Sequence, residues 1–160
     1  EDAPFMAKLL RAILRGLAVG RVEECHNPTE VINFVREFQP DIIFMDLEMP
    51  ELDGFGVTKV LRTGDESPNP FVPIVMVTAH TKRADVVQAR DAGVTEFLAK
   101  PVSAKSVYDH LAACIEAPRP FIKTKTYYGP DRRRRSEGYD GPERRRSKTA
   151  KSADAAKAAT

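Results

Sequence analysis

The chain has few features that would point to a secreted, membrane or metal-stapled protein. Its 160 residues include only two cysteines, Cys25 and Cys114, which lie far apart without the CxxC spacing of zinc or redox sites. No apolar run approaches the roughly 20 residues that a helix needs to cross a bilayer. The chain begins Glu1-Asp2, without the basic and apolar segments of a secretory signal. We therefore expect a cytoplasmic protein without disulfides, structural zinc or a membrane span.

Signatures of several enzyme classes are also absent. We find no glycine-rich phosphate loop, no catalytic triad and no zinc-type cluster of cysteine and histidine. Hydrophobic residues make up 42% of the chain, which suits a globular protein, and the length suffices for one domain of ordinary size. We expect a single folded domain followed by a tail.

Charge divides the chain into two parts of opposite sign. Residues 1–116 carry 12 Lys and Arg against 18 Asp and Glu, a net charge of −6, whereas residues 117–160 carry 13 against 5, a net charge of +8. Apolar periodicity also stops after residue 116, where Pro, Arg, Lys and Ala become frequent. The sequence thus predicts an acidic domain at 1–116 and a basic, disordered tail at 117–160.

Helical and strand patterns alternate along residues 1–116. Apolar residues recur at helical spacing from Phe5 to Leu17, and Asn27-Pro28 is a capping pair that opens a second helix through Phe38. The remaining predicted elements are helices over 54–62, 82–92 and 103–116 and strands over 22–25, 41–46, 73–78 and 96–99. Strands that alternate with helices predict an α/β fold, in which a parallel sheet lies between helix layers.

Three polar residues fall at or just past the carboxyl ends of predicted strands. Asp46 ends one strand, Thr78 ends the next, and Lys100 directly follows the last. Ligands of open parallel sheets bind at this edge, so we expect the three side chains to converge. Taken singly, Asp46 could cap a loop or helix, Lys100 could be a surface lysine, and Thr78 could be an ordinary strand residue.

The segments around these residues resemble the signatures of bacterial response-regulator receiver domains. Asp46-Leu47-Glu48-Met49-Pro50-Glu51-Leu52-Asp53-Gly54 is similar to the phosphoacceptor segment of that family. Val77-Thr78-Ala79 and Phe97-Leu98-Ala99-Lys100-Pro101 are similar to its two other signatures, in the same order. The match covers roughly residues 1–116. It implies a stand-alone, chemotaxis-regulator-like receiver with a doubly wound, flavodoxin-like parallel sheet in the strand order 2-1-3-4-5.

The resemblance implies a role for each residue of the site. Asp46 would be the phosphoacceptor, Lys100 would pair with phosphoryl oxygens, and the Thr78 hydroxyl would bind one of them. Mg²⁺ would be bound by Asp2 and Asp46 through their carboxylates, by Glu48 through its backbone carbonyl and by Glu1 through water. The protein would be a two-component signalling protein, and not an enzyme beyond its own phosphorylation and dephosphorylation. A histidine kinase or phosphotransfer protein would be the donor, and the downstream partner is not identified.

Further residues are expected to respond to phosphorylation. Movement of Thr78 toward the phosphoryl group would free space for Phe97, the expected switch aromatic, and Lys100-Pro101 is expected to be a cis peptide. Glu48 and His80 occupy positions that modulate the lifetime of the phosphoryl group in this family. The alternatives are that Phe97 is a plain core residue and that Glu48 and His80 are solvated loop residues.

The start of the domain departs from the family pattern. Receivers normally begin with an apolar strand that ends in an acidic pair, whereas this sequence starts at the pair Glu1-Asp2. In the family that strand lies between the second and third strands, so the resemblance implies an N-terminally truncated domain whose first strand is missing. Its loss would expose ladder groups and apolar surface on both neighbours, unless another segment completes the sheet.

The tail contains a repeat with the core GP[DE]RRR. Residues 127–134 recur as residues 139–146, and each copy places tyrosine ahead of an arginine cluster. Such clusters suit phosphate backbones and stacked bases, so nucleic acid or another anionic ligand is a candidate partner. The arginines concerned are Arg132, Arg133, Arg134, Arg144, Arg145 and Arg146.

Other roles for the tail stay open at this point. It could be solvated, fold back on the acidic domain, self-associate, or contact a protein or an anionic lipid surface. The rival to phosphotransfer signalling is accordingly a phosphorylation-independent adaptor that binds nucleic acid or another anionic partner through the tail.

Overall fold

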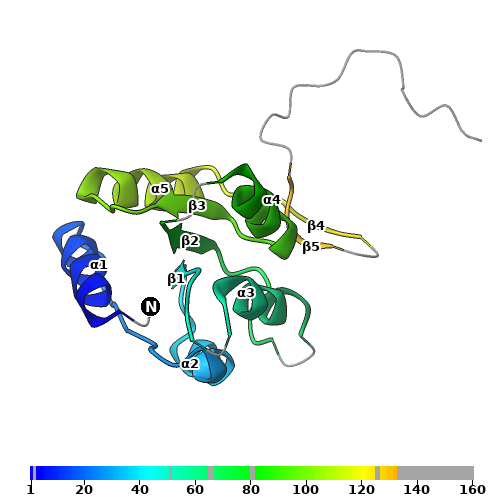
Figure 1. Ribbon diagram of the computed structural model, residues 1–160, viewed down its shortest axis with the longest axis horizontal. Coiled ribbons are helices and arrows are strands. Elements are labelled where there is room, and N and C mark those ends of the chain that lie inside the picture. Colours follow the sequence, from blue (N-terminus) through cyan, green and yellow to red (C-terminus); the bar gives the residue numbers. More distant parts are fainter. Residues whose placement is uncertain (2, 51, 65–66, 80–81, 125–126, 133–160) are drawn as a thin grey trace, which may run out of the picture.

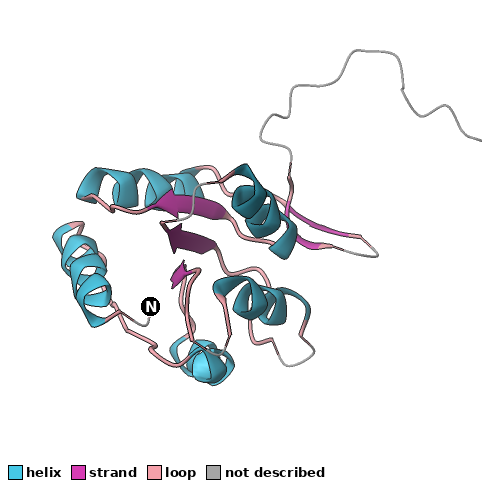
Figure 2. Ribbon diagram, in the orientation of Figure 1, coloured by secondary structure: helices cyan, strands magenta, loops and turns pink. Residues whose placement is uncertain are grey.

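The computed structural model shows a three-stranded parallel sheet between two helix layers, followed by a short hairpin (Figures 1 and 2). The structure describes residues 1, 3–50, 52–64, 67–79, 82–124 and 127–132. The helices are α1 Pro4–Gly16, the 3-10 turn η1 Pro28–Glu30, α2 Val31–Phe38, α3 Gly54–Thr63, α4 Arg83–Ala92 and α5 Ala104–Glu116. The strands are β1 Ile43–Asp46, β2 Ile74–Thr78, β3 Glu96–Ala99, β4 Phe121–Lys123 and β5 Tyr128–Pro130.

The sheet has the order β1-β2-β3, and both neighbouring pairs are parallel. All five residues of the central strand β2 are buried. Ile74 and Met76 face a core shared with α2 and α3, whereas Val75 and Val77 face a core shared with α1 and α5. Because successive side chains of a strand point to opposite faces, this continuous apolar run serves both cores at once. The predicted α/β fold is confirmed.

Local sequence explains where several helices begin and end. The Asn27 side chain accepts a hydrogen bond from the Thr29 N–H at the start of η1, and Ser103 opens α5 in a reciprocal capping box. Gly93 follows α4 with φ 97°, a left-handed conformation that glycine adopts without strain. The predicted helices agree with these boundaries to within a turn. None of the helices in the described part of the chain has the length and apolarity of a membrane span.

The strand predicted over residues 22–25 is wrong, since the described structure places this segment outside the sheet. A cavity of about 170 Å³ lies against it, lined by side chains that include Leu10, Val22, Phe34 and Phe44. β1 is consequently an edge strand, in keeping with the expected absence of the family's first strand. The described part of the chain offers this short segment no neighbouring strand to pair with, and a strand forms only with a partner that completes its ladder.

The structure also differs from the predicted disordered tail over residues 117–132. Here β4 and β5 pair in antiparallel fashion, and Tyr127 is buried. The rings of Phe71, Phe121 and Tyr128 pack edge to face, with centroids 5.5 to 6.3 Å apart. Strands of three residues are too short to produce a periodic pattern, so the sequence gives no sign of them. The rest of the expected tail, residues 133–160, lies outside the described residues.

Two arginine side chains join this hairpin to the domain. Arg62 of α3 is 1% exposed, and it donates hydrogen bonds of 2.9 Å to the carbonyls of Gly93 and Pro70. Its guanidinium lies 5.1 Å from the centroid of the Phe121 ring. Burial lowers the pKa of Arg62 to about 10. From the hairpin side, Arg119 donates to the backbone carbonyls of Thr95 and Asp131.

We predict that Arg62→Ala lowers the free energy of unfolding by about 3 kcal/mol, because it leaves two buried carbonyls unpaired and opens a cavity beneath the hairpin. Lys59→Ala, on the exposed side of the same helix, should change it by no more than about 0.5 kcal/mol. Urea unfolding followed by circular dichroism measures both. Equal losses would show that the buried contacts of Arg62 contribute nothing.

Candidate functional site

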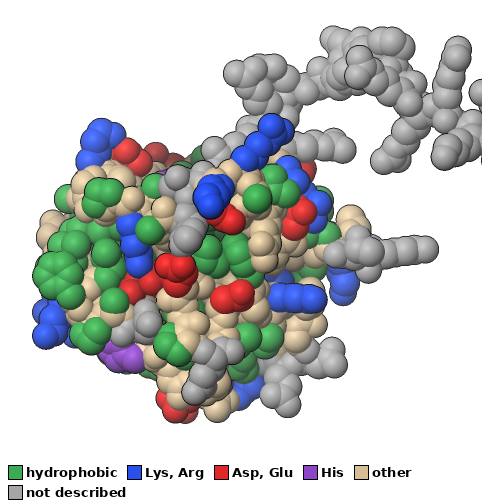
Figure 3. All heavy atoms as spheres, viewed as in Figure 1, with side chains coloured by type: hydrophobic (Ala, Val, Ile, Leu, Met, Phe, Trp, Pro, Cys, Tyr) green, Lys and Arg blue, Asp and Glu red, His purple; other side chains and the backbone are tan. Residues whose placement is uncertain are grey.

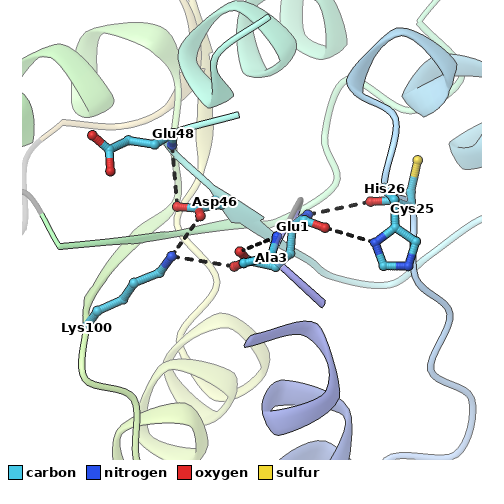
Figure 4. Close-up of polar contacts among 7 residues, drawn as sticks. All are labelled: Glu1, Ala3, Cys25, His26, Asp46, Glu48 and Lys100. Carbon is cyan, nitrogen blue, oxygen red and sulfur yellow. Dashed lines mark hydrogen bonds and ion pairs between the residues drawn. The ribbon is translucent and has the colours of Figure 1, made fainter. Parts of the chain in front are cut away.

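An ion pair lies at the carboxyl edge of the sheet. Asp46, the last residue of β1, is 5% exposed, and its Oδ2 lies 2.7 Å from Nζ of Lys100 (Figure 4). The Lys100 N–H also donates to the Thr78 carbonyl, which ties the end of β3 to the end of β2. Parallel pairing thus brings together Asp46, Lys100 and the backbone of Thr78, which come from three strand ends.

A second carboxylate shares this lysine. The Glu1 side chain is 8% exposed, and its Oε2 lies 3.6 Å from Nζ of Lys100. That oxygen has no hydrogen-bond partner among the described residues. Burial raises the pKa of Glu1, and the negative charge of Asp46 raises it further. One lysine therefore faces two carboxylates that are largely removed from water.

The lysine remains charged in this setting. Burial disfavours the ammonium of Lys100, but the hydrogen bond to Asp46 and the charges of Asp46 and Glu1 outweigh burial and raise its pKa. Lys100 supplies one positive charge, and two ionised carboxylates would leave the cluster with one negative charge in excess. The Lys100–Pro101 peptide is cis, as the resemblance implied.

The loop after β1 supports Asp46 from the backbone side. The Glu48 N–H donates to Oδ1 of Asp46 at 3.4 Å, and Figure 4 shows the Glu48 carboxylate directed away from Asp46. Gly54 begins α3 directly against the site, and a Cβ there would collide with the Asp46 carbonyl oxygen and the Met76 sulfur. Sequence reasoning gave Gly54 no role. Its signal was a glycine immediately after the capping residue Asp53.

The other expected site residues fall into two groups. Thr78 is buried at the end of β2, and Phe97 is half-buried in β3, where it packs against the α2–α3 core. These contacts are those of a core residue, so the switch role of Phe97 stays a prediction. Asp2 and His80 lie outside the described residues.

The donor atoms at this edge suit a small hard cation. The described residues contain no cluster of three or more acidic, histidine or cysteine side chains, and the expected ligand Asp2 is not among them. Glu1 and Asp46 still offer carboxylate oxygens, including Oε2 of Glu1, which accepts no hydrogen bond among the described residues. Mg²⁺ prefers oxygen ligands and binds through one or two carboxylates together with water or phosphate. The residues present therefore fit Mg²⁺.

Of the six tail arginines, only Arg132 lies within the described residues. Its Nη1 is 3.3 Å from Oδ1 of Asp91 on α4, and its guanidinium lies 3.9 Å from the centroid of the Tyr127 ring. Arg132 thus contacts the acidic domain, and the anion-binding role expected for it stays a prediction. The other five, Arg133, Arg134, Arg144, Arg145 and Arg146, lie outside the described residues.

Comparisons with known proteins identify the family. The model of the response regulator receiver domain matches residues 1–112. The chain is 32% identical over 103 residues to the polar-differentiation response regulator DivK of Brucella anthropi, which covers 64% of this chain and 81% of DivK. It is also 32% identical over 113 residues to the DNA-binding response regulator MtrA of Mycolicibacterium smegmatis, of which it spans about half: 71% of this chain and 47% of MtrA are covered.

Solved structures agree with this assignment. The receiver domain of a sensor histidine kinase from Pseudomonas aeruginosa, crystallised with a magnesium ion in its active site cleft, is 28% identical with a TM-score of 0.64 and covers 73% of this chain and 93% of that domain. Chemotaxis protein CheY4 of Vibrio cholerae shares the fold, with 24% identity, a TM-score of 0.62 and coverage of 69% and 90%. The family model, the relatives and the shared fold lead to one conclusion: the chain belongs to the response-regulator receiver family and is a receiver domain of two-component signal transduction.

Proposed function

We propose that Asp46 is the phosphoacceptor of this receiver, with a histidine kinase or a phosphotransfer protein as the donor in the cytoplasm. The observation that carries the proposal is the buried ion pair between Asp46 and Lys100 at the carboxyl edge of the sheet. A buried carboxylate beside a lysine is a suitable phosphoryl acceptor, because the cation offsets charge that would otherwise repel the incoming group.

The transfer itself balances at Asp46. A carboxylate oxygen forms a bond to phosphorus while the bond from phosphorus to the donor's imidazole nitrogen breaks, and the released imidazole takes up a proton. The product is an acyl phosphate. Lys100 would pair with its phosphoryl oxygens, and the hydroxyl of Thr78, at the neighbouring strand end, would bind another of them.

Mg²⁺ would be held at the same edge by the carboxylates of Asp46 and Asp2 and by the Glu48 carbonyl, with Glu1 acting through water. When bound, it supplies positive charge that offsets the repulsion between the carboxylates and the phosphoryl group. The Oε2 of Glu1, which accepts no hydrogen bond among the described residues, and the single lysine beside two carboxylates support this arrangement. The magnesium ion in the related receiver domain supports it as well.

The signal would leave through a protein-binding surface around α4, β3 and α5. Val86, Val87 and Tyr108 are exposed there, and a change in their arrangement would alter the affinity for a partner. The rival adaptor role, independent of phosphorylation, is less well supported. The one tail arginine that the structure describes, Arg132, is already paired with Asp91 and Tyr127.

The phosphoacceptor is tested by incubating the chain with Mg²⁺ and a small phosphodonor and measuring its intact mass. The wild type should gain the mass of one phosphoryl group, and Asp46→Asn should gain none, since an amide oxygen is a poor nucleophile toward phosphorus. Asp41→Asn, an exposed position just ahead of β1, serves as the matched control and should behave as the wild type. An adduct on Asp46→Asn equal to that of the wild type would assign the reaction to another residue.

Mg²⁺ binding is tested through stability. A saturating concentration should raise the free energy of unfolding of the wild type by about 1 to 3 kcal/mol, because the ion binds only the folded state. Glu1→Gln should lose much of that gain. Without Mg²⁺ the same variant should be slightly more stable than the wild type at pH 7, since it removes a charge that burial and Asp46 both disfavour.

Glu48→Gln is the control for this measurement, because it removes an exposed charge while keeping the backbone carbonyl. It should retain the full response to Mg²⁺. Equal responses of Glu1→Gln and Glu48→Gln in urea unfolding would remove Glu1 from the ligand set.

A further inference from the structure

Helix α4 connects the two edges of the sheet. It follows β2, which ends at Thr78 beside Asp46, and it finishes at Gly93, just ahead of the amino end of β3 (Figure 1). Its ten residues span about 15 Å. If a change at the phosphoacceptor edge displaced this helix, the residues at its carboxyl end, near the opposite edge of the sheet, would therefore be displaced as well.

Few side chains anchor α4 in the core. Ala89 is its only buried residue, while Val86 and Val87 are exposed. Within the main domain the helix packs chiefly against α3. An element with so little buried apolar area moves at a lower free-energy cost than the other parts of a core.

The β4–β5 hairpin packs closely against the carboxyl end of this helix. A Cβ on Gly129 would lie 2.9 Å from Gly93 Cα and 2.7 Å from the Tyr127 hydroxyl, so the two glycines meet with no room to spare. In the other direction, a Cβ on Gly93 would lie 3.1 Å from the Tyr128 carbonyl oxygen. Contacts at this density lose about a quarter to a half of their attraction when a gap of about 0.5 to 1 Å opens between the atoms.

A second contact ties the hairpin to the last turn of α4. Arg132 lies 3.3 Å from Asp91 and stacks on Tyr127, whose hydroxyl donates to the Pro130 carbonyl. Arg132 is also the first arginine of the GPDRRR core, so the arginines that follow it in sequence start from this point. The contact between the hairpin and α4 accordingly fixes the position of Arg132, the first residue of this arginine cluster.

Figure 3 shows Lys and Arg side chains beside Asp and Glu side chains near the top of the face in view. The hairpin lies beyond residues 1–112, which the family model matches. Its contacts with α4 therefore involve residues outside the segment that the family model matches.

We propose that the β4–β5 hairpin is a latch on the carboxyl end of α4, and that a phosphoryl group on Asp46 loosens the latch by shifting α4. The proposal rests on the proposed function, which supplies the signal at the other end of the helix. Coupling between two sites is reciprocal, so loosening the latch must favour the phosphorylated arrangement by the same factor.

Hydrogen exchange on the full chain tests the forward direction. Beryllofluoride with Mg²⁺ is a stable mimic of a phosphoryl group on a carboxylate, and it allows the measurement at equilibrium. Amides of residues 119–132 should exchange about fivefold faster when it is bound, a coupling at the lower end of the usual range. Amides of α1, which lies at the opposite end of the molecule from the hairpin in Figure 1, should keep their rates.

The reverse direction is tested by the affinity for beryllofluoride in hairpin variants. Arg132→Gln removes the contact with Asp91 and should tighten binding severalfold. Lys123→Gln is the matched control, since its ammonium contacts the Tyr128 ring within the hairpin and should leave the affinity unchanged.

The outcomes separate the two proposals. Binding to the wild type without faster exchange over 119–132, or equal affinities of the two variants, would overturn the latch while leaving the phosphoacceptor assignment in place. The hairpin would then be a static cap on the domain. Failure of beryllofluoride to bind the wild type would count against Asp46 as phosphoacceptor and would overturn the latch with it, because the latch takes its signal from that residue.

Discussion

Parallel pairing of β1, β2 and β3 is the constraint on which the rest of this receiver depends. It places all three carboxyl ends at one edge, and so it brings Asp46 within 2.7 Å of Lys100 across 54 residues of sequence. Parallel strands need long crossovers, and the helices that provide them cover both faces of β2. The close approach at this edge in turn requires glycine at position 54, where any side chain would strike the backbone of Asp46.

The same convergence creates an electrostatic imbalance. Glu1 and Asp46 share one lysine, and burial makes the charge on Glu1 costly. Hydrophobic packing of α1 and α5 against β2 has to offset that cost, because the ion pair of Glu1 with Lys100 leaves its Oε2 without a hydrogen bond among the described residues. This excess of negative charge serves a function when a bound cation neutralises it. Stability and activity therefore make opposite demands on this edge of the sheet.

Local sequence predicted most of the fold, because the determinants of the main elements are local. The caps Asn27 and Ser103 and the apolar runs into Asp46 and Thr78 depend on neighbouring residues alone. The approach of Asp46, Lys100 and Thr78 also followed, since strand polarity determines it. The strand predicted over residues 22–25 was wrong, because a strand forms only beside a neighbouring strand, and the local sequence does not show whether one is present. The role of Glu1 beside Lys100 and that of Gly54 beside Asp46 are contacts in three dimensions, which periodicity does not report.

The β4–β5 hairpin shows why amino-acid composition wrongly predicted disorder after residue 116, although local sequence patterns predicted the helices of the main domain. Residues 117–132 have the charge and proline content of a disordered segment, yet arginine and glycine make many of the contacts that hold the β4–β5 hairpin, together with its aromatic rings. Arg62 and Arg119 satisfy backbone carbonyls, and Gly129 fits against Gly93 because it has no side chain. A guanidinium stacked on an aromatic ring stabilises a fold as an apolar side chain does, although composition counts it as solvated charge. Arginine beside tyrosine is thus as consistent with packing as with anion binding, and in the first copy of the repeat the packing role is the one that Arg132 fills.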